Sequence, residues 1–216
     1  MTKGMTSRIL LTSPIHWPKR TAKNRGCLWP QFFVFTDCER LPDPSFLFKR
    51  LPRGAAIILR HTDPKQRARL AHNMTPKAQR CGLNVLISED IRLALKINAD
   101  GVHLSEGQAK RGPLRHSSKK PGFIITAAAH SHLALWQANK AGAHFMMLSP
   151  IFSTASHTMA KPLGLWRAIR LSNTQRHKVI ALGGISMQNK NRFKNSSFQG
   201  FGAIGAWLDS QSSTQT

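Results

Sequence analysis

Acidic residues are scarce in this chain: 9 of its 216 residues are Asp or Glu, against 32 Lys and Arg, which gives a formal net charge of +23. An imbalance of this kind is typical of proteins that meet polyanions, including nucleic acids. The basic residues are spread along the chain rather than gathered in one run, and no zinc-finger, RRM or KH signature accompanies them. We therefore expect nucleic acids to bind only non-specifically, through charge.

Cysteine is also rare, and Cys27, Cys38 and Cys81 lie far apart without a CxxC pair. An odd, dispersed set argues against a disulfide framework and is typical of a reducing cytoplasm. No apolar run reaches the roughly 18 residues that a membrane span needs, and the N-terminus lacks the long apolar core of a secretory signal. These absences predict a cytoplasmic protein that does not enter the membrane.

The first 30 residues carry basic side chains, no acid, and prolines at positions 14, 18 and 30. We interpret 1–30 as a poorly ordered basic extension. A mitochondrial-type presequence is the alternative, although these prolines would make a poor amphipathic helix. The remainder is predicted to be one domain over 31–210, followed by a polar tail over 211–216.

Within that domain, short apolar runs alternate with segments of helical character at a period of about 25 residues, which is typical of a (β/α)8 barrel. A doubly wound sheet is the rival fold, but it usually places its phosphate-binding glycines after the first strand, and here the glycine pair comes late. The expected strands are 31–37, 55–60, 84–87, 101–104, 123–127, 143–148, 178–182 and 201–204, and the expected helices include 45–50, 64–80, 90–98, 106–116, 131–141 and 165–171. The predicted fold is a single (β/α)8 barrel.

Two loops late in the chain carry the residue types that bind phosphate. The loop after the sixth strand holds the hydroxyl groups of Thr154 and Ser156 and the cation His157, and the seventh strand ends at Gly183-Gly184. Paired glycines before a helix expose backbone N–H groups that hold phosphates, and barrels of this kind often bind phosphate on the loops after strands seven and eight. The alternative for the glycine pair is a plain strand-to-helix turn.

A set of short motifs, in this order, resembles the thiamine-phosphate synthase and TenI (thiazole tautomerase) superfamily over residues 32–208. The motifs are Thr36-Asp37, Ala99-Asp-Gly-Val-His-Leu104, Ala129-His130-Ser131, Ser149-Pro-Ile-Phe-Ser-Thr154, Pro162-Leu-Gly164 and Ile180-Ala-Leu-Gly-Gly-Ile185. The resemblance implies an enzyme that joins hydroxymethylpyrimidine diphosphate to a thiazole phosphate and releases pyrophosphate, with magnesium holding the diphosphate. TenI-like relatives instead shift protons on the thiazole, with a histidine as acid and base and no metal.

The resemblance also implies roles for individual residues. The thiazole-phosphate side corresponds to Thr154, Ser156, Gly183, Gly184, Ile204 and Gly205, with His157 at the position of a family lysine. The diphosphate side corresponds to Arg60 and Ser88, and Glu89 and Glu106 are the candidate Mg²⁺ ligands. His130 is the candidate acid or base.

The diphosphate side departs from the family pattern at several positions. Ile58 and Thr62 replace a glutamine and a lysine, Gln108 replaces a metal aspartate, and Ala128 replaces a serine. Three functions stay open: a synthase-like transferase acting on phosphorylated thiamine precursors, a TenI-like metal-independent enzyme or thiazole-phosphate binder, and a non-enzymatic polyanion-binding barrel. The sequence leaves the oligomeric state open, with a homo-oligomer among the outcomes.

Overall fold

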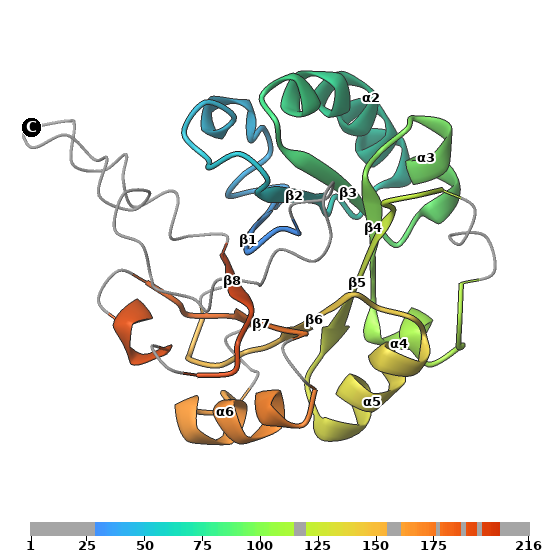
Figure 1. The fold of residues 1–216 in the computed structure, drawn as a ribbon. Coiled ribbons are helices and arrows are strands. Elements are labelled where there is room, and N and C mark those ends of the chain that lie inside the picture. The colour runs from blue at the N-terminus through green and yellow to red at the C-terminus, as the bar shows by residue number, and fades with distance from the viewer. Residues whose placement is uncertain are drawn as a thin grey trace, which may run out of the picture.

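The computed structural model describes residues 29–114, 120–154, 161–175, 178–186, 189–193 and 196–203. Its eight parallel strands form a closed barrel, in which each strand pairs with the next and β8 returns to β1 (Figure 1). The strands are β1 (Phe32–Phe35), β2 (Ala56–Leu59), β3 (Asn84–Ser88), β4 (Gly101–Leu104), β5 (Ile124–Ala129), β6 (Phe145–Leu148), β7 (Val179–Leu182) and β8 (Gly200–Ala203). The prediction of a single (β/α)8 barrel is confirmed.

Helices connect the strands and lie around the outside of the barrel (Figure 1). They are the 3₁₀ turn η1 (Ser45–Leu47), α2 (Pro64–Arg80), α3 (Ile91–Lys96), α4 (Glu106–Ala109), α5 (His132–Lys140), α6 (Leu165–Asn173) and the 3₁₀ turn η3 (Lys190–Phe193). Asp63 caps α2 by accepting the backbone N–H groups of Lys65 and Gln66, with Pro64 at the first helical position, as the Asp-Pro pair predicts. Within the described ranges, no helix is long and apolar enough to cross a membrane.

The strands are apolar on both faces because one face fills the barrel and the other meets the helices. Alternate strand residues form the interior cluster, which is Phe33, Phe35, Ala56, Ile58, Leu86, Ile124, Phe145, Met147 and Ile180. The intervening residues, such as Val34, Ile57 and Val102, join the larger cluster shared with the helices. This alternation follows from the period of two along a strand, and it leaves the two ends of the barrel as the places where polar groups gather.

Trp29 lies at the end of the interior where the strands begin. Its ring is 4.8 Å from that of His144 and meets Phe145 edge-on at 5.6 Å. Pro30 beside it is buried. These two residues, which the sequence assigned to the basic extension, therefore pack on the barrel, while 1–28 lie outside the described residues and the extension itself stays a prediction.

The helix predicted over 106–116 is the main difference from expectation, because α4 ends after a single turn at Ala109. Gly112 has a positive φ of 89°, and Pro113 follows it and lacks the N–H that a continuing helix would use. The chain therefore cannot extend α4 through this point. Most predicted strands agree with the structure to within one or two residues.

Candidate active site at the carboxyl ends of the strands

The candidate site residues that the structure describes all follow the carboxyl ends of strands. Because every strand pair is parallel, these ends lie together at one mouth of the barrel. The residues are Arg60 after β2, Ser88 and Glu89 at the end of β3, Glu106 after β4, His130 after β5, Thr154 after β6, and Gly183 and Gly184 after β7. Ser156, His157, Ile204 and Gly205 lie outside the described residues, and their roles stay predictions.

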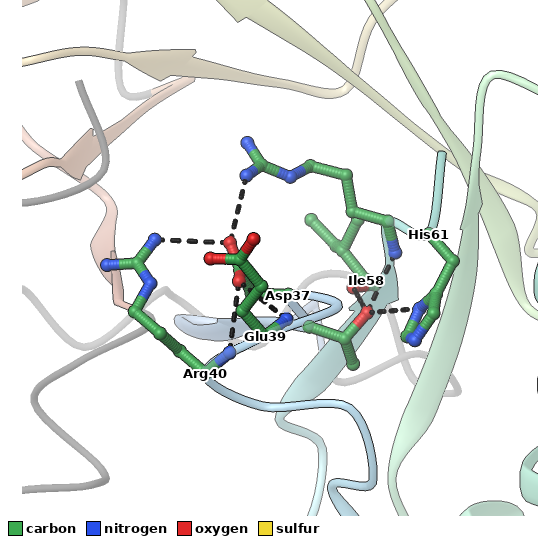
Figure 2. A network of polar contacts seen from close by, with 7 residues as sticks. Asp37, Glu39, Arg40, Ile58 and His61 are labelled. Atoms are coloured by element: carbon green, nitrogen blue, oxygen red, sulfur yellow. Dashed lines mark hydrogen bonds and ion pairs between the residues drawn. The ribbon is translucent and has the colours of Figure 1, made fainter. Parts of the chain in front are cut away.

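Asp37, which follows β1, is the centre of a charged network at this mouth (Figure 2). Its Oδ2 lies 3.1 Å from Nη2 of Arg40 and 3.6 Å from Nη2 of Arg60. Its Oδ1 accepts the backbone N–H groups of Glu39 and Arg40 at 3.2 and 3.1 Å. Burial acts to raise the pKa of Asp37, but these hydrogen bonds and the Arg40 charge outweigh it and hold the pKa below its usual value. Asp37 is therefore ionised at neutral pH.

The β2 loop is fixed from both sides beside this network. The Thr36 hydroxyl accepts the backbone N–H of Arg60 at 2.8 Å and lies 3.4 Å from Nδ1 of His61. From the other side, Nη1 of Arg67 donates to the His61 carbonyl at 2.9 Å. Burial lowers the pKa of His61, and Asp37 opposes that shift while Arg67 adds to it. The backbone of Arg60 is thus held in place without using its guanidinium group.

His103 lies below the mouth, inside the barrel. Its Nδ1 shares a hydrogen bond of 2.8 Å with the Thr126 hydroxyl, and its ring meets Phe35 edge-on at 5.3 Å. Burial, and then the charge of Arg60, lowers its pKa to about 3. His103 is therefore neutral at pH 7 and packed inside the barrel.

The two candidate metal carboxylates are held in different ways. Glu89 is exposed, has a positive φ of 62°, and accepts a hydrogen bond of 2.8 Å on its backbone carbonyl from the Gln108 amide. Glu106 begins α4, where its Oε2 accepts a hydrogen bond of 2.8 Å from Nδ1 of His130 and its Oε1 lies 3.4 Å from Nζ of Lys110. In the described part of the chain, no group of three or more His, Cys, Asp or Glu side chains could hold a metal ion.

The Glu106–His130 pair joins two neighbouring strand ends. The His130 hydrogen bond lowers the pKa of Glu106, against a smaller opposing effect of burial. His130 comes directly after β5, which ends at Ala129, so it lies at the mouth of the barrel. Its side chain is 51% exposed, against 28% for Glu106. The ring is therefore oriented by a carboxylate and still open to solvent, which suits proton transfer.

The glycine pair after β7 lies against the loop that follows β6. Gly183 and Gly184 have φ values of 93° and 66°, which residues with a Cβ rarely adopt. A Cβ on Gly183 would lie 2.9 Å from Cα of Pro150, and one on Gly184 would lie 2.6 Å from Cβ of Phe152. Phe152 donates its N–H to the Gly183 carbonyl at 3.1 Å. Only glycine therefore lets the two loops approach this closely.

The same contacts leave the glycine N–H groups available for a ligand. In the described ranges, neither Gly183 nor Gly184 donates its backbone N–H to a protein acceptor. The Gly184 carbonyl, in contrast, accepts a hydrogen bond of 2.8 Å from the Asn189 amide, which fixes the turn. Two amides held in place without an acceptor are what an anion-binding turn requires.

The sequence indicates candidate residues at the mouth but not which of them contact one another. Asp37 appears in the Thr-Asp motif and Glu106 among the candidate ligands, but nothing in the sequence joins Asp37 to Arg60 or Glu106 to His130 across 23 or 24 positions. The one available signal is local: Arg40 stands three residues after Asp37, a spacing at which side chains of one turn often meet.

A parallel eight-stranded barrel with a glycine turn and basic side chains at its mouth is the arrangement that barrel enzymes acting on phosphorylated ligands use. A family model described as thiamine monophosphate synthase (TMP-TENI) matches residues 42–206. The chain belongs to this family, as its motifs predict.

Known relatives agree with this placement. The chain is 33% identical over 186 residues to the "Putative thiamine-phosphate synthase 2" of Aquifex aeolicus (strain VF5), which covers 83% of this chain and 98% of that one. It is 28% identical over 183 residues to a thiamine-phosphate synthase of Syntrophomonas wolfei, covering 82% and 87% of the two chains. A solved thiamine phosphate pyrophosphorylase from Pyrococcus furiosus superposes with a TM-score of 0.63 at 20% identity, over 82% of this chain and 86% of that one, which shows the shared fold.

Proposed function

We propose that this protein is a thiamine-phosphate-synthase-like transferase, which joins hydroxymethylpyrimidine diphosphate to a thiazole phosphate and releases pyrophosphate. The observation that carries the proposal is the family match over 42–206, together with a named synthase relative that aligns along almost its whole length. The mouth of the barrel supports it, because anion-binding groups lie on both the β1–β2 side and the β6–β7 side.

In this reaction the bond between the pyrimidine methylene carbon and the diphosphate oxygen breaks, and its electron pair leaves with pyrophosphate. The thiazole nitrogen then donates its lone pair to that carbon. The protein must hold two anionic substrates in register and balance the charge of the leaving group. We assign the thiazole phosphate to the backbone N–H groups of Gly183 and Gly184 with Thr154, and the diphosphate to Arg60 with Ser88 beside it.

Magnesium is the cofactor that the family resemblance implies, with Glu89 and Glu106 as its predicted ligands. Mg²⁺ prefers carboxylate and phosphate oxygens together with water. Both oxygens of Glu106 already have protein partners, Nδ1 of His130 and Nζ of Lys110, and no group of three or more possible ligand side chains is found in the described part of the chain. As placed, these residues do not fit a preformed magnesium site, so we assign the charge balance to the protein's own cations. Whether the reaction requires Mg²⁺ is tested by comparing activity with Mg²⁺ and with a chelator.

The test is a transfer assay with both substrates, with Mg²⁺ or with a chelator, that measures thiamine phosphate and pyrophosphate together. We expect the two products in equal amounts and their loss in Arg60→Ala. Arg53→Ala is the matched control, because Arg53 precedes β2 and lies at the opposite end of the barrel from the mouth. A folded protein that forms neither product under either condition would refute the transferase.

A second function, a TenI-like proton shift on the thiazole ring without metal, is favoured by the Glu106–His130 pair. A histidine held by a carboxylate and open to the mouth can remove and return a proton near neutral pH. Exchange of thiazole protons with deuterated water, followed by NMR, tests this function. We expect exchange to stop in His130→Gln and to slow in Glu106→Gln; exchange that is equal in both variants and wild type would rule it out.

We further propose that the protein acts in the cytoplasm on these small phosphorylated molecules. The unpaired thiols of Cys38 and Cys81 support a reducing compartment. Cell fractionation with an antibody against the chain tests the location. The polyanion-binding alternative predicts that duplex nucleic acid stays bound at about 0.15 M salt, whereas non-specific attraction should be lost there.

A further inference from the structure

Two arginines from different strand ends share one carboxylate at the mouth of the barrel. Arg40 comes from the turn after β1 and Arg60 from the end of β2, and both place Nη2 near Oδ2 of Asp37, at 3.1 and 3.6 Å. Figure 2 shows Arg40 and His61 on opposite sides of Asp37. Two guanidinium groups from different loops therefore meet at one carboxylate oxygen.

The two arginine side chains are more exposed to solvent than the carboxylate that they share. The Arg40 and Arg60 side chains are 31% and 37% exposed, against 16% for Asp37. The 3.6 Å separation from Asp37 is longer than a hydrogen bond. Among the described residues, the Arg60 guanidinium donates to no protein acceptor. It therefore presents its planar set of N–H groups to the mouth.

Asp37 has the contacts of a residue that orients others. Its Oδ1 is fixed by the backbone N–H groups of Glu39 and Arg40, and Thr36 fixes the Arg60 backbone from the adjacent position. The carboxylate is therefore held independently of the guanidinium groups, and it draws both toward one point. Two guanidinium groups that share one carboxylate can each donate to a different oxygen of one phosphate, which a single cation cannot do.

We infer that Asp37 is a positioning residue that holds Arg40 and Arg60 as a guanidinium pair for the terminal phosphate of a diphosphate, and that Arg40 is a substrate-binding residue. The inference deepens the proposed function and rests on it for the identity of the substrate. The two guanidinium groups by themselves favour a phosphate oxyanion, and the choice of a diphosphate comes from the proposed function. On this basis, the β1 turn contributes directly to the site.

The alternative is that Asp37 and Arg40 form a surface ion pair that only stabilises the turn, and one substitution separates the two readings. Asp37→Asn keeps an oxygen that can accept the N–H groups of Glu39 and Arg40, and it removes the negative charge. If Asp37 merely stands near an anion site, removing its charge should leave diphosphate binding unchanged or strengthen it. If Asp37 orients the pair, binding should weaken even though the net positive charge rises.

The experiment measures binding of inorganic pyrophosphate to the full chain by calorimetry, at about 0.15 M salt to limit long-range effects of charge. We expect Arg40→Gln and Asp37→Asn each to weaken binding by about tenfold or more, the loss typical of one charge-assisted hydrogen bond. Arg40→Lys should lie between Arg40→Gln and wild type, because it keeps the charge and loses the planar fork. Arg53→Gln is the control that removes one positive charge at the other end of the barrel, and it should change the affinity less than twofold.

Three further measurements show where an effect comes from. Thiazole phosphate binding and the melting temperature should change little in Asp37→Asn, which separates loss of orientation from loss of fold. Adding Arg40→Gln to Asp37→Asn should cost less than the two single effects combined, because both act on the same guanidinium group.

Equal or tighter pyrophosphate binding in Asp37→Asn, unchanged binding in Arg40→Gln, or no measurable binding by the wild type would each overturn the inference. The assay contains neither pyrimidine nor thiazole, so its result is independent of the transfer reaction. Weakened pyrophosphate binding in the variants, with no transfer activity in the wild type, would leave the guanidinium pair standing and refute only the proposed function.

Discussion

Replacing the buried His103 tests how the interior of the barrel responds to acid. In the unfolded chain this histidine binds a proton near its ordinary pKa of 6.5, whereas in the folded barrel burial and the Arg60 charge lower the pKa to about 3. Between these two values the unfolded chain binds more protons than the folded one. Protonation of His103 therefore favours the unfolded state, and the free energy of unfolding decreases as the pH falls from 6.5 toward 3.

The size of this effect at pH 5 depends little on the exact folded pKa. From the ordinary value of 6.5 down to pH 5 there are about 1.5 pH units, each worth about 1.36 kcal/mol, so wild type should lose about 2 kcal/mol through this group. Any folded pKa below about 4 gives nearly the same result, because the folded protein then remains unprotonated at His103.

The assay compares urea unfolding of wild type and His103→Asn at about pH 7.5 and about pH 5. Asn keeps a polar atom near the Thr126 hydroxyl but leaves space beside Phe35, so His103→Asn should be less stable at both pH values. Its loss between the two values should be about 2 kcal/mol smaller than that of wild type. His61 and His144, whose pKa values are also lowered by burial, contribute equally to both proteins and cancel. An equal loss in the two proteins would show that His103 is not held neutral by its surroundings.

Three other substitutions test separate parts of the fold. Gly184→Ala should lower the free energy of unfolding by about 1–2 kcal/mol because its backbone is left-handed, and by more because its Cβ would lie 2.6 Å from Cβ of Phe152. Calorimetry with thiazole phosphate should show weaker binding in the same variant. Unchanged stability and binding would contradict the close approach of the two loops. Trp29→Ala should lower the free energy of unfolding by about 2 kcal/mol, because the ring packs on His144 at the barrel end, and a neutral result would mean that Trp29 is outside the fold. Asp63→Ala should cost about 1 kcal/mol in denaturant unfolding by removing the cap of α2, whereas Asp63→Asn, which can still cap, should cost less.

The barrel could be predicted from the sequence because its signal is repeated and local. Each strand is a short apolar run that stands out from its surroundings, such as 145–148 or 179–182, and each run is followed by a segment with helical signals. Eight repeats of one pattern in one order leave few folds to consider. The same locality explains the correct prediction of the Asp63 cap, which involves only neighbouring residues.

The sequence did not predict the length of α4 or the contacts of the carboxylates at the mouth. The first depends on one backbone feature, and the second on contacts between residues far apart in the chain. The Gly112-Pro113 pair ends α4 early, although the residues before it favour a helix. At the mouth, the partners of Asp37 and Glu106 are set by which strand ends become neighbours when the barrel closes. The spacing of these residues in the sequence does not encode that geometry, so the sequence could indicate candidate residues but not their contacts.

The scarce acids of this chain have a consistent arrangement that bears on its high positive charge. Several act on the backbone: Asp43, Asp63, Asp90 and Asp100 each accept backbone N–H groups at a turn, a helix start or a strand start. At the mouth, Asp37 faces two arginines and Glu106 faces His130 and Lys110. Each of these two carboxylates thus has two basic side chains as neighbours, and it can orient both of them. Orientation of basic side chains by carboxylates, more than the total charge of +23, is what would distinguish a substrate site from a merely basic surface.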